Sequence, residues 1–190
     1  RRLRESGVSC VLLNLPLAPL GEGGLACTPG RESEFRHGVK TAIEYARALD
    51  CPLMNCPAAD APRGVAPSQV RATYVANLRR AADSLAEEGV GLVIEPLNTT
   101  DVPRSFLRTS KQARSIIRDV GSANLGLQHD LYHTQIMEGD LSRGISLNLE
   151  VIRHVQIADN PGRHEPGTGE TNIPFLLDRL DDLGYSGWVG

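Results

Sequence analysis

The segment Val90-Gly91-Leu92-Val93-Ile94-Glu95 is a continuous apolar run that ends in a carboxylate. A short run that is apolar on both faces is typical of a strand covered by helices on both sides. Apolar residues at helical spacing precede it in residues 67–89 and follow it in residues 110–120. The segment therefore predicts a buried strand of a parallel sheet, with a helix before it and another after it.

Strand-like and helix-like segments alternate along the whole chain. The expected strands are residues 10–15, 52–56, 90–95, 125–130 and 154–157, with a sixth strand beginning near Trp188. The expected helices are residues 32–49, 67–89, 110–120, 141–150 and 173–183. Repeated strand–helix units predict an α/β fold in which helices cover a parallel sheet.

We expect this sheet to belong to a (β/α)8 TIM barrel. Such a barrel usually needs roughly 250 residues, whereas this chain has 190. The chain begins at Arg1 and stops at Gly190, within strand-like sequence. We therefore expect residues 1–190 to form a single domain that is a fragment, with strands 3 to 8 of the barrel and the last strand incomplete. A doubly wound open sheet is the alternative, because periodicity alone does not close a sheet.

The composition argues against nucleic-acid and membrane partners. The net charge is -3, and acidic and basic residues are interspersed, which leaves no extended basic face for nucleic acid. No apolar run approaches the roughly 18 residues of a membrane span, and no signal-peptide pattern is visible. Four cysteines without zinc-knuckle or CxxC spacing predict reduced thiols and a cytoplasmic protein, with mitochondria as the alternative.

A glycine-rich segment, Gly21-Glu22-Gly23-Gly24-Leu25-Ala26, matches the dinucleotide-binding pattern GxGxxG/A. Pro16 and Pro19 separate it from the preceding strand, and Pro29 follows where the phosphate-binding helix should begin. We therefore expect no nucleotide site there and interpret the segment as a flexible loop over the barrel mouth.

Polar side chains close three successive apolar runs: Glu95 follows residues 90–94, Asp130 follows residues 125–129 and Gln156 follows residues 151–155. In a parallel barrel the C-terminal ends of all strands converge on one mouth, so these side chains could share one metal ion. Oxygen ligands favour a hard divalent cation, magnesium or else manganese, over zinc. The alternative for each residue is a polar group where a strand meets solvent. Repetition on three strands favours the metal site.

Three side chains beyond these strand ends could contact a substrate. Asp101 follows the third strand, His133 is expected in the loop after the fourth, and Arg163 lies in the glycine-rich loop after the fifth. An imidazole can bond to a ligand oxygen, and a guanidinium suits a carboxylate or a pair of oxygens. The alternative for Arg163 is a surface arginine. We expect His129 and His154 to pack in the core instead.

Several runs resemble the hydroxypyruvate isomerases. These are Ile94-Glu95-Pro96-Leu97-Asn98, Gln128-His129-Asp130-Leu131-Tyr132-His133, His154-Val155-Gln156-Ile157-Ala158-Asp159-Asn160-Pro161-Gly162-Arg163 and Glu165-Pro166-Gly167-Thr168-Gly169-Glu170. Residues 26–32 and 187–190 look similar as well. The likeness covers nearly the whole chain, and its wider relatives are the xylose isomerase-like TIM barrels and the ketose 3-epimerases.

The resemblance implies a divalent metal held by two glutamates, an aspartate and a glutamine, with the glutamates also moving the substrate proton. Glu95, Asp130 and Gln156 match three of these ligands, and the fourth would stand just after Gly190. The implied reaction interconverts hydroxypyruvate and 2-hydroxy-3-oxopropanoate, a small hydroxy-keto acid. Its proton leaves the carbon beside a carbonyl and returns to the neighbouring carbon through an enediol, with Glu95 as the expected carrier.

In ketose epimerases that are similar to this chain, the positions matching Asp101, His133 and Arg163 contact substrate oxygens. A ketose 3-epimerase or sugar isomerase of the same barrel family is therefore an alternative reading. An abasic-site endonuclease and a catalytically inactive binding protein are alternatives from other classes. A homo-oligomer is compatible with the sequence, which leaves the oligomeric state open.

Overall fold

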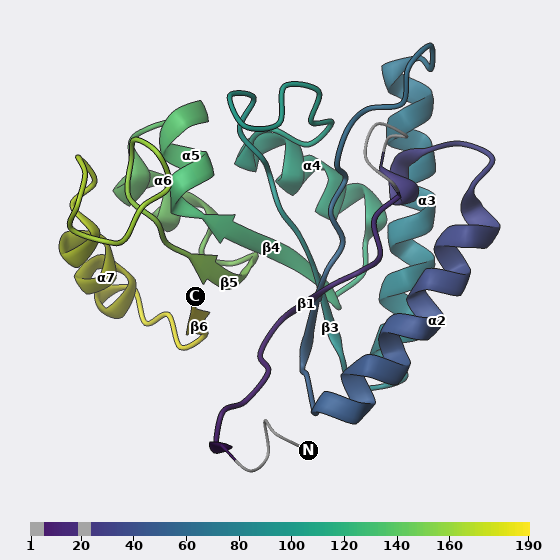
Figure 1. Cartoon of the computed structure of the whole chain (residues 1–190), viewed down its shortest axis with the longest axis horizontal. Coiled ribbons are helices and arrows are strands. Elements are labelled where there is room, and N and C mark those ends of the chain that lie inside the picture. The colour runs from purple at the N-terminus through teal and green to yellow at the C-terminus, as the bar shows by residue number, and fades with distance from the viewer. Residues whose placement is uncertain (1–5, 19–23) are drawn as a thin grey trace.

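The sheet has six parallel strands in consecutive order. The computed structural model describes residues 6–18 and 24–190, and its strands are β1 (Leu13–Asn14), β2 (Leu53–Asn55), β3 (Gly91–Ile94), β4 (Leu125–Asp130), β5 (Ile152–Gln156) and β6 (Trp188–Val189). Each strand pairs in parallel with the next. A doubly wound sheet would reverse its strand order, whereas a barrel wall does not. The curled sheet in Figure 1 is thus part of a barrel, and the α/β TIM-barrel prediction is confirmed.

Helices join the strands and cover the outside of the sheet. They are α2 (Glu32–Leu49), α3 (Pro67–Ala86), α4 (Ser110–Val120), α5 (Leu131–Met137), α6 (Leu141–Asn148) and α7 (Ile173–Asp182), with the 3-10 turn η1 (Leu25–Cys27) before α2. Figure 1 shows α2 and α3 side by side at one end of the sheet and α6 and α7 at the other. Their apolar stripes pack on the strands, so the core lies between the helices and the sheet.

Local capping sets several of these boundaries. The Thr109 side chain accepts a hydrogen bond from the backbone N of Gln112 at the start of α4, and Gly121 ends the helix at φ 69°. A left-handed backbone at that position favours glycine. The expected bounds of α2, α4 and β4 match the structure, whereas the helix expected to reach Gly89 ends at Ala86.

The expectation that His133 lies in a loop is wrong, because His133 belongs to α5. The helix begins directly after β4, where Asp130 Oδ1 accepts hydrogen bonds from the backbone N atoms of Tyr132, at 2.8 Å, and His133, at 3.4 Å. Its seven residues are too few for an apolar repeat to reveal a helix. Asp130 is therefore the N-cap of a helix as well as the last residue of a strand.

The glycine-rich segment is only partly a loop. Gly21 to Gly23 lie outside the described residues, whereas Gly24 and Ala26 are buried and η1 packs on α3. Asn77 Nδ2 of α3 donates to the Ala26 carbonyl at 2.9 Å. A Cβ on Gly24 would lie 1.7 Å from the Ala58 carbonyl oxygen. The described part of the segment is thus fixed in the interior, contrary to the expectation of a flexible loop.

All four cysteines are free thiols, and Cys27, Cys51 and Cys56 are buried. Within residues 6–18 and 24–190, no helix combines the length and the apolar composition that a membrane crossing requires.

Candidate active site

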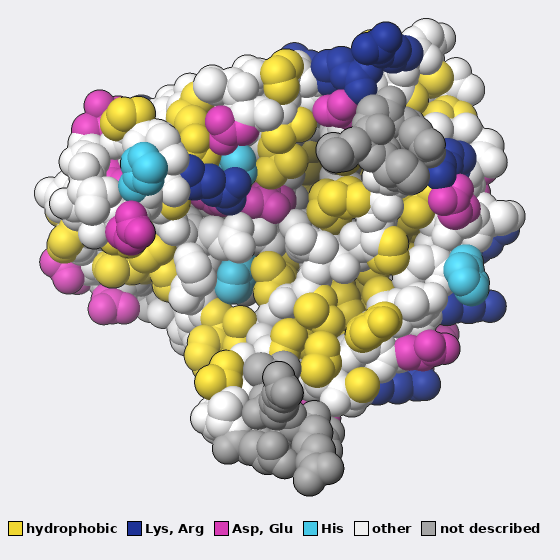
Figure 2. Space-filling model, viewed as in Figure 1, with side chains coloured by type: hydrophobic (Ala, Val, Ile, Leu, Met, Phe, Trp, Pro, Cys, Tyr) yellow, Lys and Arg dark blue, Asp and Glu magenta, His cyan; other side chains and the backbone are white. Residues whose placement is uncertain are grey.

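A cavity of about 490 Å³ opens at the C-terminal ends of the strands. Four strands contribute an amide to its lining, namely Asn14 of β1, Asn55 of β2, Gln128 of β4 and Gln156 of β5, and Glu95 adds a carboxylate directly after β3. His133 of α5 and Arg163 of the loop between β5 and α7 complete the polar lining. In Figure 2, acidic, basic and histidine side chains gather beside α5 at these strand ends. The parallel register therefore brings together polar groups that are far apart in the sequence.

Glu95 is a buried carboxyl group with 8% of its surface exposed. Its Oε2 accepts a hydrogen bond from Asn55 Nδ2 at 2.9 Å, and Asn55 Nδ2 also donates to Asn14 Oδ1 at 3.1 Å. Burial, and then the negative charge of Asp130, raise the pKa of Glu95 from 4.5 to about 7. Glu95 can consequently gain or lose a proton near neutral pH.

One Asp130 oxygen bonds to the backbone, and the other faces two residues that line the cavity, Arg163 and His133. Oδ1 caps α5, while Oδ2 accepts a hydrogen bond from Arg163 Nη2 at 3.1 Å and lies 3.7 Å from His133 Nε2. The Arg163 guanidinium also stacks over the Tyr132 ring, 5.3 Å from its centroid. Asp130 thus orients both a helix and a guanidinium at the rim of the cavity.

Glu95, Asp130 and His133 each offer one ligand atom, and these atoms lie within 4.8 Å of one another. Two buried carboxylates this close repel each other when both are ionised, and a cation between them would relieve that repulsion. The buried Gln128 Oε1 has no hydrogen-bond partner among the described residues. Gln156 Oε1, which accepts from Gln128 Nε2 at 2.8 Å, lines the same cavity. This arrangement of oxygen donors fits a divalent metal ion.

The loop that carries Arg163 is fastened by a second aspartate. Asp159 Oδ1 accepts from the backbone N of Thr171 and of Asn160, both at 2.9 Å, and Oδ2 accepts from that of Gly167 at 2.8 Å. These hydrogen bonds, with that from Thr171 the strongest, lower the pKa of Asp159 to about 2. The carboxylate therefore stays ionised and holds the loop closed at both ends.

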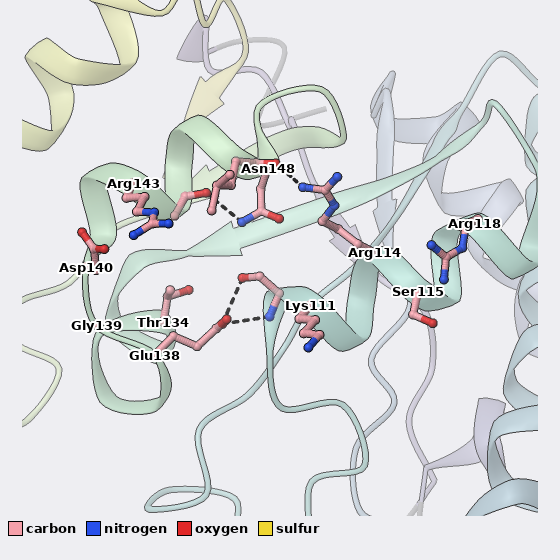
Figure 3. A pocket seen from close by; sticks show the side chains of 13 residues that line it. Lys111, Arg114, Ser115, Arg118, Thr134, Glu138, Gly139, Asp140, Arg143 and Asn148 are labelled. Atoms are coloured by element: carbon pink, nitrogen blue, oxygen red, sulfur yellow. Dashed lines mark hydrogen bonds between the residues drawn. The ribbon is translucent and has the colours of Figure 1, made fainter.

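A second hollow, of about 560 Å³, lies on the outer surface between α4 and α6 (Figure 3). There Glu138 Oε1 accepts hydrogen bonds from the backbone N and the Oγ of Ser110, and Asn148 Nδ2 donates to the Gly144 carbonyl. Glu138 is exposed, unlike the acids at the barrel mouth. The Glu138 hydrogen bonds tie the end of α5 to the start of α4, and the Asn148 hydrogen bond lies within α6, so these polar groups serve the packing and the candidate active site is the cavity at the strand ends.

The family model described as xylose isomerase-like TIM barrel matches residues 1–190. The chain belongs to the xylose isomerase-like TIM barrel family. The hydroxypyruvate isomerase of Escherichia coli (strain K12) is 48% identical over 190 residues, which cover 99% of this chain and 74% of that protein. The 2-oxo-tetronate isomerase of Cupriavidus necator is 42% identical over 193 residues, covering 100% of this chain and 74% of that protein.

A solved structure supports the assignment of this chain to the xylose isomerase-like family. A crystal structure from Brucella melitensis, described as an AP endonuclease of family 2, has a TM-score of 0.96 and 40% sequence identity. The match covers 100% of this chain and 74% of the Brucella chain. The sequence motifs predicted a resemblance to hydroxypyruvate isomerases. This prediction is confirmed, because the matches to these relatives cover the whole chain.

Most of the predicted site residues of this xylose isomerase-like chain lie around one cavity. Glu95, His133, Gln156 and Arg163 line it, and Asp130 lies directly behind. Asp101 is exposed and does not line the cavity. Its Oδ2 accepts hydrogen bonds from Asn98 Nδ2 and the Tyr132 hydroxyl, both at 2.9 Å, so its contacts within the chain are with loop and helix residues.

Four amides of the site were not predicted from the sequence, namely Asn14, Asn55, Asn98 and Gln128. Asn14 and Asn55 are the last residues of β1 and β2, the same kind of position that points to Gln156. The two core histidines behave as expected: His129 and His154 are buried and do not line the cavity. Burial lowers the pKa of His129 to about 4, which keeps this imidazole neutral.

Proposed function

We propose that this chain is an isomerase of small hydroxy-keto acids that interconverts hydroxypyruvate and 2-hydroxy-3-oxopropanoate. The observation that carries the proposal is Glu95, a buried carboxyl group of the cavity lining whose ligand atom lies within 4.8 Å of those of Asp130 and His133. The relatives named hydroxypyruvate isomerase and 2-oxo-tetronate isomerase, at 48% and 42% identity, support the substrate class.

Glu95 is the group that moves the proton in this proposal. Isomerisation of a hydroxy-keto acid takes a proton from one carbon and returns a proton to the neighbouring carbon. Glu95 is buried at the cavity wall, so as a carboxylate it can accept the proton and, once protonated, return it; burial and the charge of Asp130 favour that protonated form. Asn55 holds Oε2 by a hydrogen bond at 2.9 Å and so fixes the orientation of the carboxyl group.

Substrate binding is assigned to the rim of the cavity. The Arg163 side chain is 49% exposed and is oriented by Asp130 at 3.1 Å, so its remaining N–H groups can bind the carboxylate of a keto acid. His133 lines the cavity and is assigned to a substrate oxygen. Asp101 would assist only after movement of its loop, because it lies outside the lining.

The metal in this proposal is magnesium, with manganese as the alternative, and Glu95, Asp130 and Gln156 would hold it. When bound, such an ion would polarise the substrate oxygens and stabilise negative charge on them. The support from the chain is the short separation of the Glu95 and Asp130 ligand atoms, within 4.8 Å, and the side-chain oxygen of Gln156 on the same cavity. Ligands that are all oxygen favour these hard cations.

The experiment that tests the proposal measures hydroxypyruvate isomerisation by the full chain, with EDTA and then with added Mg²⁺ or Mn²⁺. We expect EDTA to abolish turnover and the metal to restore it. Exchange of the carbon-bound hydrogen of the substrate in deuterated water reports proton transfer by itself, and Glu95→Gln should nearly abolish it. Undiminished turnover in EDTA would remove the metal from the proposal, and undiminished exchange in Glu95→Gln would remove Glu95 as the proton carrier.

An abasic-site endonuclease is the second candidate, because the Brucella structure carries an endonuclease description. Arg163 is the sole lysine or arginine among the described residues that line the cavity, and the chain has a net charge of -3. Figure 2 shows basic side chains in separate places on this face, interspersed with acidic ones. DNA binding depends on phosphate contacts and falls with salt, so salt-dependent binding of an abasic duplex would favour the endonuclease. We expect none.

A further inference from the structure

A buried asparagine lies behind the imidazole of His133. Asn98 follows Glu95 by three residues and is 0% exposed. Its side-chain Nδ2 lies 2.7 Å from His133 Nδ1, and its backbone N donates to the same ring nitrogen at 3.3 Å. His133 Nδ1 therefore faces two N–H groups of one residue.

The orientation of the Asn98 amide is fixed by its other hydrogen bonds. Oδ1 accepts from the backbone N of Thr100 at 2.9 Å and of Asp101 at 2.8 Å. Nδ2 donates to Asp101 Oδ2 at 2.9 Å. A flipped amide would point its NH₂ group at two backbone N–H groups and its oxygen at a carboxylate, so the flip loses three hydrogen bonds. The atom that faces His133 is consequently the nitrogen.

Nδ1 of His133 can only accept in this environment. A proton on Nδ1 would point at two donors and leave buried N–H groups without acceptors, which is costly. A neutral imidazole carries one proton, so that proton must be on Nε2. Nε2 is buried, has no hydrogen-bond partner among the described residues, and lies 3.7 Å from Asp130 Oδ2, beyond hydrogen-bond distance.

We propose that Asn98 is a positioning residue that holds His133 as the neutral tautomer with its proton on Nε2, so that this N–H donates a hydrogen bond to a substrate oxygen. The proposal rests on the proposed function only for the identity of the substrate. It also separates His133 from the metal ligands, because the one lone pair of the ring faces Asn98 and a protonated Nε2 cannot ligate a cation. His133 thus acts as a donor beside Glu95 rather than as a third ligand.

The first test reads the tautomer directly and needs no activity. Long-range ¹H–¹⁵N correlation spectra of the metal-free full chain distinguish a protonated ring nitrogen from an unprotonated one, and the His133 signals are assigned by their loss in His133→Gln. We expect a protonated Nε2 and an unprotonated Nδ1 at neutral pH. A protonated Nδ1 in the wild-type chain would overturn the proposal, whatever the enzyme assay shows.

The second test changes what faces Nδ1. Asn98→Asp is made together with Asp101→Asn, because Asn98 Nδ2 donates to the Asp101 carboxylate at 2.9 Å and two carboxylates there would repel each other. The exchange keeps an oxygen for the backbone N–H groups of residues 100 and 101 and replaces the Nδ2 donor by an acceptor of the same size, and Asp101→Asn alone is the reference. We expect Nδ1 to become protonated and kcat for hydroxypyruvate to fall about tenfold or more, because a positioned donor of this kind contributes about 10²- to 10³-fold where it has been removed completely. Protonation of Nδ1 with kcat unchanged, or Nδ1 left unprotonated, would overturn the role of Asn98.

Thr109→Ala is the matched control for lowered stability. The Thr109 side chain caps α4 by accepting a hydrogen bond from the backbone N of Gln112. Loss of such an N-cap lowers the free energy of unfolding by about 1 kcal/mol. We expect the control to keep the wild-type tautomer and kcat. A change of the His133 signals in Thr109→Ala would show that the readout follows stability and would count against the proposal.

Discussion

Glu95→Gln should make the metal-free protein more stable at alkaline pH. Burial, and then the charge of Asp130, raise the pKa of Glu95 from 4.5 to about 7 in the folded chain. Between these two pH values the folded chain binds more protons at this group than the unfolded chain, so the free energy of unfolding falls as pH rises. The stability linked to the protonated carboxyl is fully present below pH 4.5 and lost as pH rises through about 7.

The magnitude follows from the same pKa. A difference of about 2.5 pH units corresponds to about 3 kcal/mol at 1.36 kcal/mol per unit. The side chain is 8% exposed, so solvent screens this effect little. Glutamine has nearly the same volume and no charge at any of these pH values. We therefore expect Glu95→Gln to exceed the wild type by about 2 to 3 kcal/mol at pH 8 and by less than about 1 kcal/mol at pH 5.

Urea titrations of both proteins in EDTA at pH 5 and pH 8 measure these differences. Glu44→Gln is the matched control, because Glu44 is an exposed residue of α2 and the substitution removes the same charge. We expect the control to follow the wild type at both pH values. Equal free energies of unfolding for the wild type and Glu95→Gln at pH 8 would refute the reasoning that burial beside Asp130 destabilises the ionised carboxyl.

Three further changes test how the site is supported. Asp130→Ala should be about 1 kcal/mol less stable than Asp130→Asn in urea titrations, because only asparagine keeps an oxygen that accepts from the backbone N of Tyr132 in α5. Equal stability of the two variants would show that this N-cap contributes nothing. The Asp159 carboxylate stabilises its loop above pH 3.8, and this stability is lost as pH falls through about 2. Asp159→Asn at neutral pH should therefore accelerate limited proteolysis of the loop that follows Asp159. Unchanged cleavage would show that the carboxylate does not hold this loop. Gly169→Ala should lower the Tm, since its Cβ would lie 2.1 Å from the Asn160 carbonyl oxygen, whereas Gly144→Ala, with nothing within 4 Å, should not.

The elements with strong local signals are those whose bounds the sequence predicts. α4 has a threonine N-cap and a glycine directly after its last residue, and its expected range, residues 110–120, is that of the structure. α5 has seven residues, and its N-cap is the strand residue Asp130, so no local pattern separates it from a loop. An apolar repeat becomes visible only over about 11 to 18 residues, which explains why it does not reveal so short a helix.

The candidate site is likewise predicted only where neighbouring residues form a recognisable pattern. Glu95, Asp130 and Gln156 are recognisable in the sequence because each closes an apolar run, and parallel strands direct their C-terminal ends to one mouth. Asn55 closes β2 in the same way, yet its role depends on the hydrogen bond to Glu95 Oε2, 40 residues away. No pattern of neighbouring residues encodes that pairing.

The amino-acid sequence by itself determined the α/β alternation, the parallel sheet and the polar residues at the strand ends, because periodicity and capping depend on neighbours within a few positions. Only the tertiary structure decided the pKa of Glu95, the hydrogen bond of Arg163 to Asp130 across 33 residues, and the contact of Asn98 with His133 across 35. Each of these depends on burial and on distances of about 3 Å, which arise when the strands pair and the loops close over their ends.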